Sequence, residues 1–179
     1  MSVSLSMWWK SPNMTLTVSQ VRPSDETTFL DAVLRSRALF RDWVDPPDSP
    51  QRFAAHLVRY AADNRFSYLA RNERDQLIGC INLNDIVRGA SQSASLGYYA
   101  FTPHSGQGLM KQAMARVIDR AFGLHGLHRL EANIQPDNRA SAGLVRSVGF
   151  RLEGHSPRYL KIAGDWRDHD RYALTAEEW

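Results

Sequence analysis

Residues 98–110 read YYAFTPHSGQGLM, and this stretch decides the fold. A strand pattern ends in a short loop with two glycines, and a strongly amphipathic helix follows. Gly106 and Gly108 carry no side chain, so backbone N–H groups there can approach a ligand closely. A helix start also leaves free N–H donors at the positive end of its dipole. The stretch predicts an anion site suited to a pyrophosphate; the alternative is a plain turn that needs glycine for its geometry.

Two common phosphate-binding motifs are excluded by the residues after the second glycine. A Walker loop requires Gly-Lys followed by Ser or Thr, but Gly108 is followed by Leu109 and Met110. The dinucleotide fingerprint requires a third glycine at position 111, which is Lys111. The expected anion site therefore belongs to neither class.

Outward from this stretch, periodicity predicts a mixed α/β layer around a mostly antiparallel sheet. About seven strands and about four helices are expected. The helices are predicted at 25–40, from Ser49 to Ala61, at 108–122 and at 138–148, and the strands at 16–21, 66–71, 77–87, 94–101, 128–135, 150–159 and 169–174. The three strands before the 108–122 helix are predicted to form an antiparallel meander.

Length and composition limit the class of protein. With 179 residues the chain suits one domain with a full core. The single cysteine, Cys80, excludes an intrachain disulfide and a cysteine-rich zinc site, and it fits a reducing compartment. The N-terminus does not resemble a signal peptide, and no apolar run approaches 18 residues. We expect a soluble, cytoplasmic protein with a flexible leader at residues 1–14 and no membrane partner.

The charge balance does not indicate nucleic-acid binding. The formal net charge is +3, and a nucleic-acid-binding protein usually shows a clustered basic face. Nineteen of the 22 basic residues are arginine, which suits bidentate recognition of phosphate. Lys111, Arg139 and Arg146 lie on or beside the helices expected to flank the anion site, where they are candidates to meet phosphates.

A second motif follows about 30 residues after the glycines. Asn138 is a candidate N-cap, Ser141 lies in the first turn of the same helix, and Gly149-Phe150 follow its end. Gly-Gln-Gly opening a helix, then Asn-Arg-Ala-Ser, then Gly-Phe, resembles the GNAT superfamily of acetyl-CoA-dependent N-acetyltransferases. Stretches 84–89, 96–98, 128–130 and 164–169 resemble its ribosomal-protein-alanine N-acetyltransferase branch. The resemblance implies a single acetyltransferase domain over residues 15–179.

The resemblance also implies where coenzyme A binds, with no metal required. The glycine loop would hold the pyrophosphate through backbone N–H groups, the strand before it would bond the pantetheine arm, and Asn138 and Ser141 would lie near the arm and the thiol. The implied cofactor residues are Tyr99, Ala100, Phe101, Gly106, Gln107, Gly108, Leu109, Met110, Asn133, Asn138 and Ser141. Ser105 and Met110 depart from the family's usual loop, whose contacts come mainly from the backbone.

The implied reaction is direct attack of a neutral amine on the thioester. A hydroxyl near the leaving sulfur can supply its proton, so Ser141 is the candidate general acid. For the base, Glu131 and His104 are candidates, with a solvated strand carboxylate and an exposed loop histidine as the alternatives. Strand alternation places Asn133 on the same side as Glu131, where it can bond the arm or the acceptor.

The acceptor cleft is expected between the first two helices and the last two strands. Trp43, beside the acidic Asp42, Asp45 and Asp48, is a candidate to hold a cationic amine or an aromatic ring, with core packing as the alternative. Tyr159 and Trp166 are further substrate-binding candidates. The leading acceptor is a protein N-terminal α-amine. The alternatives are a small amine, such as an aminoacyl nucleotide or an antibiotic, and a CoA-binding module without turnover. A monomer and a homodimer are both compatible with the sequence.

Overall fold

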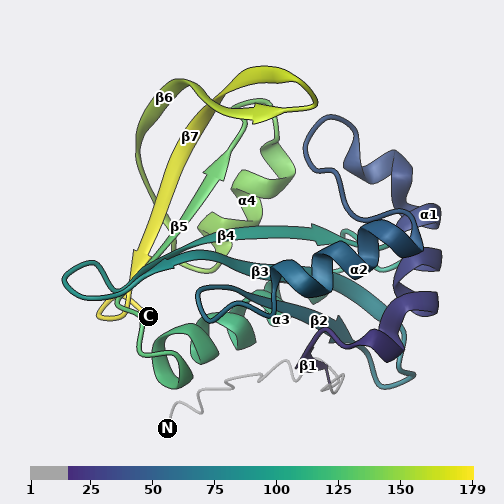
Figure 1. The fold of residues 1–179 in the computed structure, drawn as a ribbon. Coiled ribbons are helices and arrows are strands. Elements are labelled where there is room, and N and C mark those ends of the chain that lie inside the picture. Colours follow the sequence, from purple (N-terminus) through teal and green to yellow (C-terminus); the bar gives the residue numbers. More distant parts are fainter. Residues whose placement is uncertain (1–15) are drawn as a thin grey trace, which may run out of the picture.

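A seven-stranded mixed sheet runs through the computed structural model, which describes residues 16–179 (Figure 1). The strands lie in the order β1-β2-β3-β4-β5-β7-β6. Their bounds are Thr17–Gln20 (β1), Phe66–Arg71 (β2), Leu77–Val87 (β3), Ser93–Ala100 (β4), Arg129–Ile134 (β5), Arg151–Ile162 (β6) and Asp165–Thr175 (β7). The leader expected at residues 1–14 lies outside the described residues.

The described residues form four α-helices, two for each face of the sheet (Figure 1). They are α1 (Glu26–Phe40), α2 (Pro50–Arg59), α3 (Leu109–Asp119) and α4 (Arg139–Ser147). Alternation along β2 separates the two cores: Tyr68 and Ala70 are buried with α3 and α4, whereas Leu69 is buried with α1 and α2. The predicted fold class is therefore confirmed, and so is the antiparallel meander of β2, β3 and β4.

The strands β4 and β5 are paired over only part of their length. β4 pairs antiparallel with β3 as far as Ala100. Its parallel pairing with β5 runs only from Ser93, opposite Arg129, to Leu96, opposite Ala132. Beyond Leu96 the two strands diverge (Figure 1), and the edge of β4 that faces β5 has no sheet partner within the described chain. The divergence makes an opening through the sheet between the two helix layers.

The C-terminal hairpin is longer than the sequence predicts. We expected strands at 150–159 and 169–174, but β6 and β7 continue to Ile162 and Asp165. Only Ala163 and Gly164 connect them, both with positive φ, 50° and 93°. A two-residue turn of this handedness matches the twist of an antiparallel pair, so the ladder extends to the tip of the hairpin.

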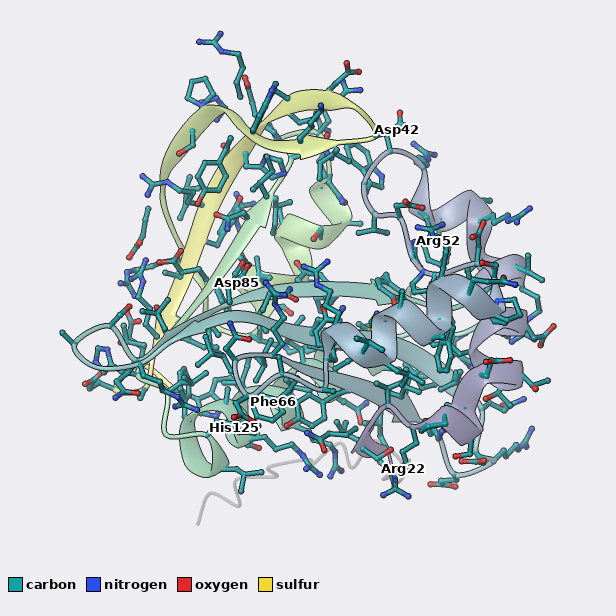
Figure 2. The ribbon with its side chains drawn as sticks, viewed as in Figure 1. Arg22, Asp42, Arg52, Phe66, Asp85 and His125 are labelled. Carbon is teal, nitrogen blue, oxygen red and sulfur yellow. The ribbon has the colours of Figure 1, made fainter. Side chains whose placement is uncertain are left out.

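The helix expected at 108–122 also ends differently. Its α-helical part stops at Asp119, and a wider π-helical turn covers Arg120–Leu124. His125 then stacks on Phe66, with ring centroids 3.9 Å apart (Figure 2). The His125 Nε2 lies 2.6 Å from the Tyr68 hydroxyl. The widened turn thus carries His125 onto β2, a tertiary contact that helical periodicity does not encode.

Two features that would point to a membrane or to a metal are not found in residues 16–179. No helix in this part of the chain has the length and apolar character needed to cross a membrane. No group of three His, Cys, Asp or Glu side chains is placed there to hold a metal ion. Cys80 is fully buried, and burial raises the pKa of its thiol to about 11, so it is held in the unreactive neutral form.

Candidate active site

The glycine turn before α3 has the geometry of an anion site. Gly106 and Gly108 adopt φ of 75° and 76°, a region that favours glycine, and Gly108 is the N-cap of α3. No acceptor within residues 16–179 takes the backbone N–H of Gly106, Gln107 or Gly108. Gly106 and Gly108 line an open cavity of about 750 Å³ beside the positive end of the α3 dipole.

This larger cavity follows the split edge of β4 from the glycine turn to α4. Its volume falls in the range typical of small-molecule and cofactor sites. It is lined by residues of α1 and the following loop, of β4, of the glycine turn and of α4. They include Arg41, Trp43, Tyr98, Tyr99, Ala100, Ser105, Gly106, Gly108, Met110, Lys111, Asp137, Asn138, Arg139 and Ser141.

The N-terminus of α4 brings a hydroxyl pair to the opening. The Asn138 Oδ1 accepts a hydrogen bond from the Ser141 backbone N–H at 3.2 Å, which confirms Asn138 as the N-cap. Its side-chain amide NH₂ remains a donor. The Ser141 Oγ lies 2.6 Å from the Tyr98 hydroxyl of β4. Burial raises the pKa of Tyr98, so its hydroxyl stays protonated and can donate to the Ser141 Oγ.

A smaller pocket of about 90 Å³ continues from the larger cavity through the split. The two share Trp43, Val44, Tyr98, Asn138 and Ser141, and the smaller pocket adds Leu96, Gly97, Asn133, Ile134, Gln135 and His169. The buried Asn133 Oδ1 has no hydrogen-bond partner among the described residues. The site thus joins a long cavity to a small polar pocket.

His169 of β7 reaches this pocket although it is buried, with 3% of its surface exposed. Its Nδ1 lies 3.0 Å from the Arg167 carbonyl oxygen. The sequence analysis overlooked His169 and Tyr98 as site residues. Strand alternation would have assigned each a face, but nothing in the sequence shows that β4 and β7 meet the same opening.

The structure brings together most of the expected cofactor residues. Tyr99, Ala100, Gly106, Gly108, Met110, Asn138 and Ser141 line the larger cavity, and Asn133 lines the smaller pocket. The side chains of Phe101, Gln107 and Leu109 point elsewhere. Phe101 is fully buried against Phe29 beneath α1, Leu109 is in the core, and Gln107 Nε2 donates to the Pro103 carbonyl oxygen at 2.9 Å.

The two expected bases lie outside both cavities. Glu131 accepts a hydrogen bond from Arg129 Nε at 2.8 Å. Arg129 also pairs with Glu153, so this carboxylate belongs to an ion-pair network on the β5–β7–β6 face. His104 is partly exposed in the glycine loop and lines neither cavity.

Of the expected acceptor residues, Trp43 lies at the site and two lie on the hairpin. Trp43 is partly buried and lines both cavities. Tyr159 and Trp166 are exposed on β6 and β7 and line neither. The Tyr159 ring nevertheless meets His169 edge-on, with centroids 6.1 Å apart. Tyr159 thus contacts His169, a residue of the smaller pocket, but does not line the pocket itself.

Two of the three carboxylates in the acidic loop beside Trp43 pair with an arginine. Arg52 Nη2 lies 2.7 Å from Asp45 Oδ2, and Arg52 Nη1 lies 2.9 Å from Asp48 Oδ1. The hydrogen bond from Arg52 lowers the pKa of Asp48. Figure 2 shows Asp42 at the tip of the loop and Arg52 at the start of α2. Asp45 and Asp48 therefore link the loop to the start of α2 through Arg52.

The structure shows where the three basic candidates for phosphate binding lie. Lys111 and Arg139 line the larger cavity, one from each flanking helix. Arg146 instead donates from Nη2 to the Tyr172 hydroxyl at 2.8 Å and packs over that ring. Two of the three basic candidates therefore line the larger cavity, and Arg146 does not.

The described chain thus combines a parallel strand pair that splits, a glycine turn at the start of one helix and a capped helix opposite. The model of the acetyltransferase (GNAT) domain family matches residues 15–151. The chain belongs to this family of acetyl-CoA-dependent N-acetyltransferases.

The chain is similar to two curated proteins and to one solved structure, which follow. A Bacillus subtilis protein named "Probable N-acetyltransferase YjcK" is 41% identical over 69% of each chain. The [ribosomal protein uS5]-alanine N-acetyltransferase of Escherichia coli is 36% identical over 60% of this chain and 55% of its own. The structure of Mycobacterium smegmatis RimJ with CoA-disulfide is 27% identical and superposes with a TM-score of 0.83, covering 91% of this chain and 83% of that one.

Proposed function

We propose that the protein transfers the acetyl group of acetyl-CoA to the α-amine of a protein N-terminus, as the uS5-alanine enzyme does. The observation that carries the proposal is the small pocket beyond the split in the sheet. Its volume is about 90 Å³, against about 750 Å³ for the larger cavity. Such a pocket has room for an amino group and a small side chain, with the rest of a peptide outside it.

The chemistry of the pocket supports a single amine over a polyamine. Its lining residues include no carboxylate. Their polar and aromatic groups are one tryptophan ring, one tyrosine hydroxyl, one serine hydroxyl, three side-chain amides and one histidine ring. A polyamine carries several positive charges and requires acidic groups along its length. The nearby carboxylates of Asp45 and Asp48 are already paired with Arg52.

Coenzyme A would lie in the larger cavity. The free N–H groups of Gly106, Gln107 and Gly108 suit its pyrophosphate, and Lys111 and Arg139 suit the remaining phosphate charge. The unpaired edge of β4 suits the amide groups of the pantetheine arm, as the Asn138 amide NH₂ does. The thioester would then sit at the split, beside the Ser141 hydroxyl.

At the thioester, Ser141 would protonate the leaving sulfur. The acid step uses the arrangement in which Tyr98 donates to the Ser141 Oγ, because the hydrogen of Ser141 is then free to point into the cavity. When the C–S bond breaks, its electron pair goes to sulfur and Ser141 supplies the proton. The new amide nitrogen releases a proton at the same stage, which replaces the one that Ser141 gave.

A second acceptor, a free amino acid, is favoured by one relative. The L-amino acid N-acyltransferase MnaT of Escherichia coli is 28% identical over 82% of this chain. A free amino acid would also need a cation for its carboxylate, and Arg41 at the larger cavity is available for it. If the acceptor is a peptide, activity should be higher with a peptide than with a free amino acid. If the acceptor is a free amino acid, the order should be reversed.

The test compares acceptors by thiol release from acetyl-CoA, with mass spectrometry of the products. The panel contains an Ala-initiated tetrapeptide amide, the same peptide with a formylated N-terminus, free alanine and spermidine. We expect kcat/KM for the tetrapeptide to exceed that for alanine at least tenfold, with no product from the formylated peptide. Equal or better use of alanine would move the assignment to the amino acid. Binding of acetyl-CoA without release on any amine would indicate a CoA-binding module.

A further inference from the structure

We propose that His169 is the general base that removes a proton from the incoming amine, a step that rests on the acetyltransfer proposed above. His169 is the imidazole among the residues that line the smaller pocket, in the part of the chain that the structure describes. It shares that lining with Tyr98 and Ser141, the pair placed at the thioester. The base would therefore approach the amine from β7 and the acid from α4.

The hydrogen bond to Arg167 fixes the tautomer of the ring. A carbonyl oxygen carries no hydrogen, so the bond of 3.0 Å requires the hydrogen to sit on His169 Nδ1. In the neutral ring the Nε2 then holds a lone pair. No residue within 16–179 bonds this Nε2, and the ring is otherwise held by the edge-on contact with Tyr159. The free acceptor nitrogen is thus available to the pocket.

The groups around His169 leave this nitrogen to the acceptor. Asn133 lies on β5, and Gln135 directly follows that strand. Tyr98 lies on β4, Asn138 caps the helix α4 that carries Ser141, and Trp43 lies in the loop after α1. On β7, Asp168 and Asp170 both reach His155, at 3.5 and 2.9 Å, because alternation turns them to the other face. Arg167 and Arg171 share the face of His169, and Arg167 Nη2 bonds Asp165.

The step balances as follows. The ammonium nitrogen gives one proton to His169 Nε2 and regains its lone pair. That pair forms the N–C bond to the thioester carbonyl, and the C–S bond then breaks with its electrons going to sulfur. Sulfur takes its proton from Ser141, the amide nitrogen returns one, and the imidazolium loses the first proton to water. Every proton of the amine is accounted for by a group at the split.

The decisive variant is His169→Asn. The asparagine Nδ2 can still donate to the Arg167 carbonyl, but the variant lacks Nε2. His155→Asn is the matched control, since His155 is exposed on the neighbouring strand and bonds only the two aspartates. The acetyl-CoA dissociation constant and the melting temperature, measured for both, report whether the fold and the cofactor site persist.

The readout is the pH dependence of kcat/KM between pH 6 and 9.5. A free α-amine has a pKa near 8, so at pH 9.5 it is already neutral and needs no base. We expect His169→Asn to reduce kcat/KM about 100-fold at pH 6.5, with a defect under tenfold at pH 9.5. A defect of equal size at every pH would reassign His169 to positioning, and activity within threefold of wild type at pH 6.5 would overturn the proposal outright.

Two further measurements separate the outcomes. If the asparagine variant does not fold, His169→Ala is assayed with and without added imidazole, and we expect imidazole to restore activity; no restoration would count against the base. The comparison is made with whichever amine the wild-type protein acetylates. Failure of the peptide alone therefore overturns the acceptor assignment and not the role of His169.

Discussion

The hydroxyl oxygens of Tyr98 and Ser141 lie 2.6 Å apart, although 43 positions separate the two residues in the chain. Tyr98 belongs to β4 and Ser141 to the first turn of α4, so the contact crosses the opening where β4 leaves β5. Burial raises the pKa of Tyr98, so its hydroxyl keeps a hydrogen that can be directed to the Ser141 Oγ and can orient the serine hydroxyl. This orientation is what the proposed acid step requires.

Replacement of Ser141 tests that step. We expect Ser141→Ala to lower kcat 10- to 100-fold, with the KM for acetyl-CoA within threefold of wild type, because general acids contribute about 10²- to 10⁴-fold and water can replace part of the role. Tyr98→Phe should lower kcat less, since it removes only the orienting bond. Steady-state kinetics measures both, with Ser91→Ala in an exposed loop as the control. Full turnover by Ser141→Ala would remove it from the mechanism.

Alanine at Gly108 tests the anion turn. Gly108 has φ of 76°, and a Cβ there would meet no protein atom within 4 Å, so it would project into space meant for the ligand. Gly89 has φ of 68° and equally open surroundings, but it lies outside the cavity. Both variants should lose about 1–2 kcal/mol of stability from backbone strain. Calorimetric titration should show weaker coenzyme A binding, tenfold or more, for Gly108→Ala alone; equal affinities would contradict the assignment.

Lys111 is expected to contact a phosphate of coenzyme A. An exposed lysine–phosphate pair is worth about 1 kcal/mol or less, so Lys111→Ala should raise the dissociation constant about 3- to 5-fold. Screening weakens such pairs, and the ratio between variant and wild type should shrink at high salt. Arg116→Ala on the same helix, outside the cavity, is the control. A salt-independent ratio would show that Lys111 acts through packing.

The buried His56 makes stability depend on pH. Its Nε2 lies 2.9 Å from the Ser67 Oγ, and burial, aided by the charge of Arg59, lowers its pKa to about 4. The unfolded chain has the ordinary pKa near 6.5, so between about pH 6.5 and 4 it binds more protons than the folded state. The free energy of unfolding should therefore fall as the pH drops through this range, by about 2 kcal/mol at pH 4.5.

Urea denaturation at pH 7 and pH 4.5 measures this effect. His56→Gln keeps a polar group toward Ser67 and cannot titrate, so the variant should lose less stability between the two pH values than the wild type. The difference between the two losses isolates His56 from the acidic groups that titrate in the same range. An identical loss in both proteins would place the acid sensitivity elsewhere.

The fold was accessible from the sequence because its signals are local. The stripe of α3, the Asn138 cap and the alternation of β2 through β4 each lie within one segment, so periodicity placed them correctly. The ends of segments were harder to predict. The tail of α3 widens to stack His125 on Phe66, and these residues lie 59 positions apart.

The sequence alone determined the glycine turn before α3 and the cap of α4, because glycine conformation and capping chemistry depend on a few neighbouring residues. Only the tertiary structure decided which side chains meet at the opening. In the structure Glu131 pairs with Arg129, and Asp45 and Asp48 pair with Arg52. His169 lines the smaller pocket. These relations depend on strand order and on where β4 leaves β5, which arise from packing between segments far apart in the chain.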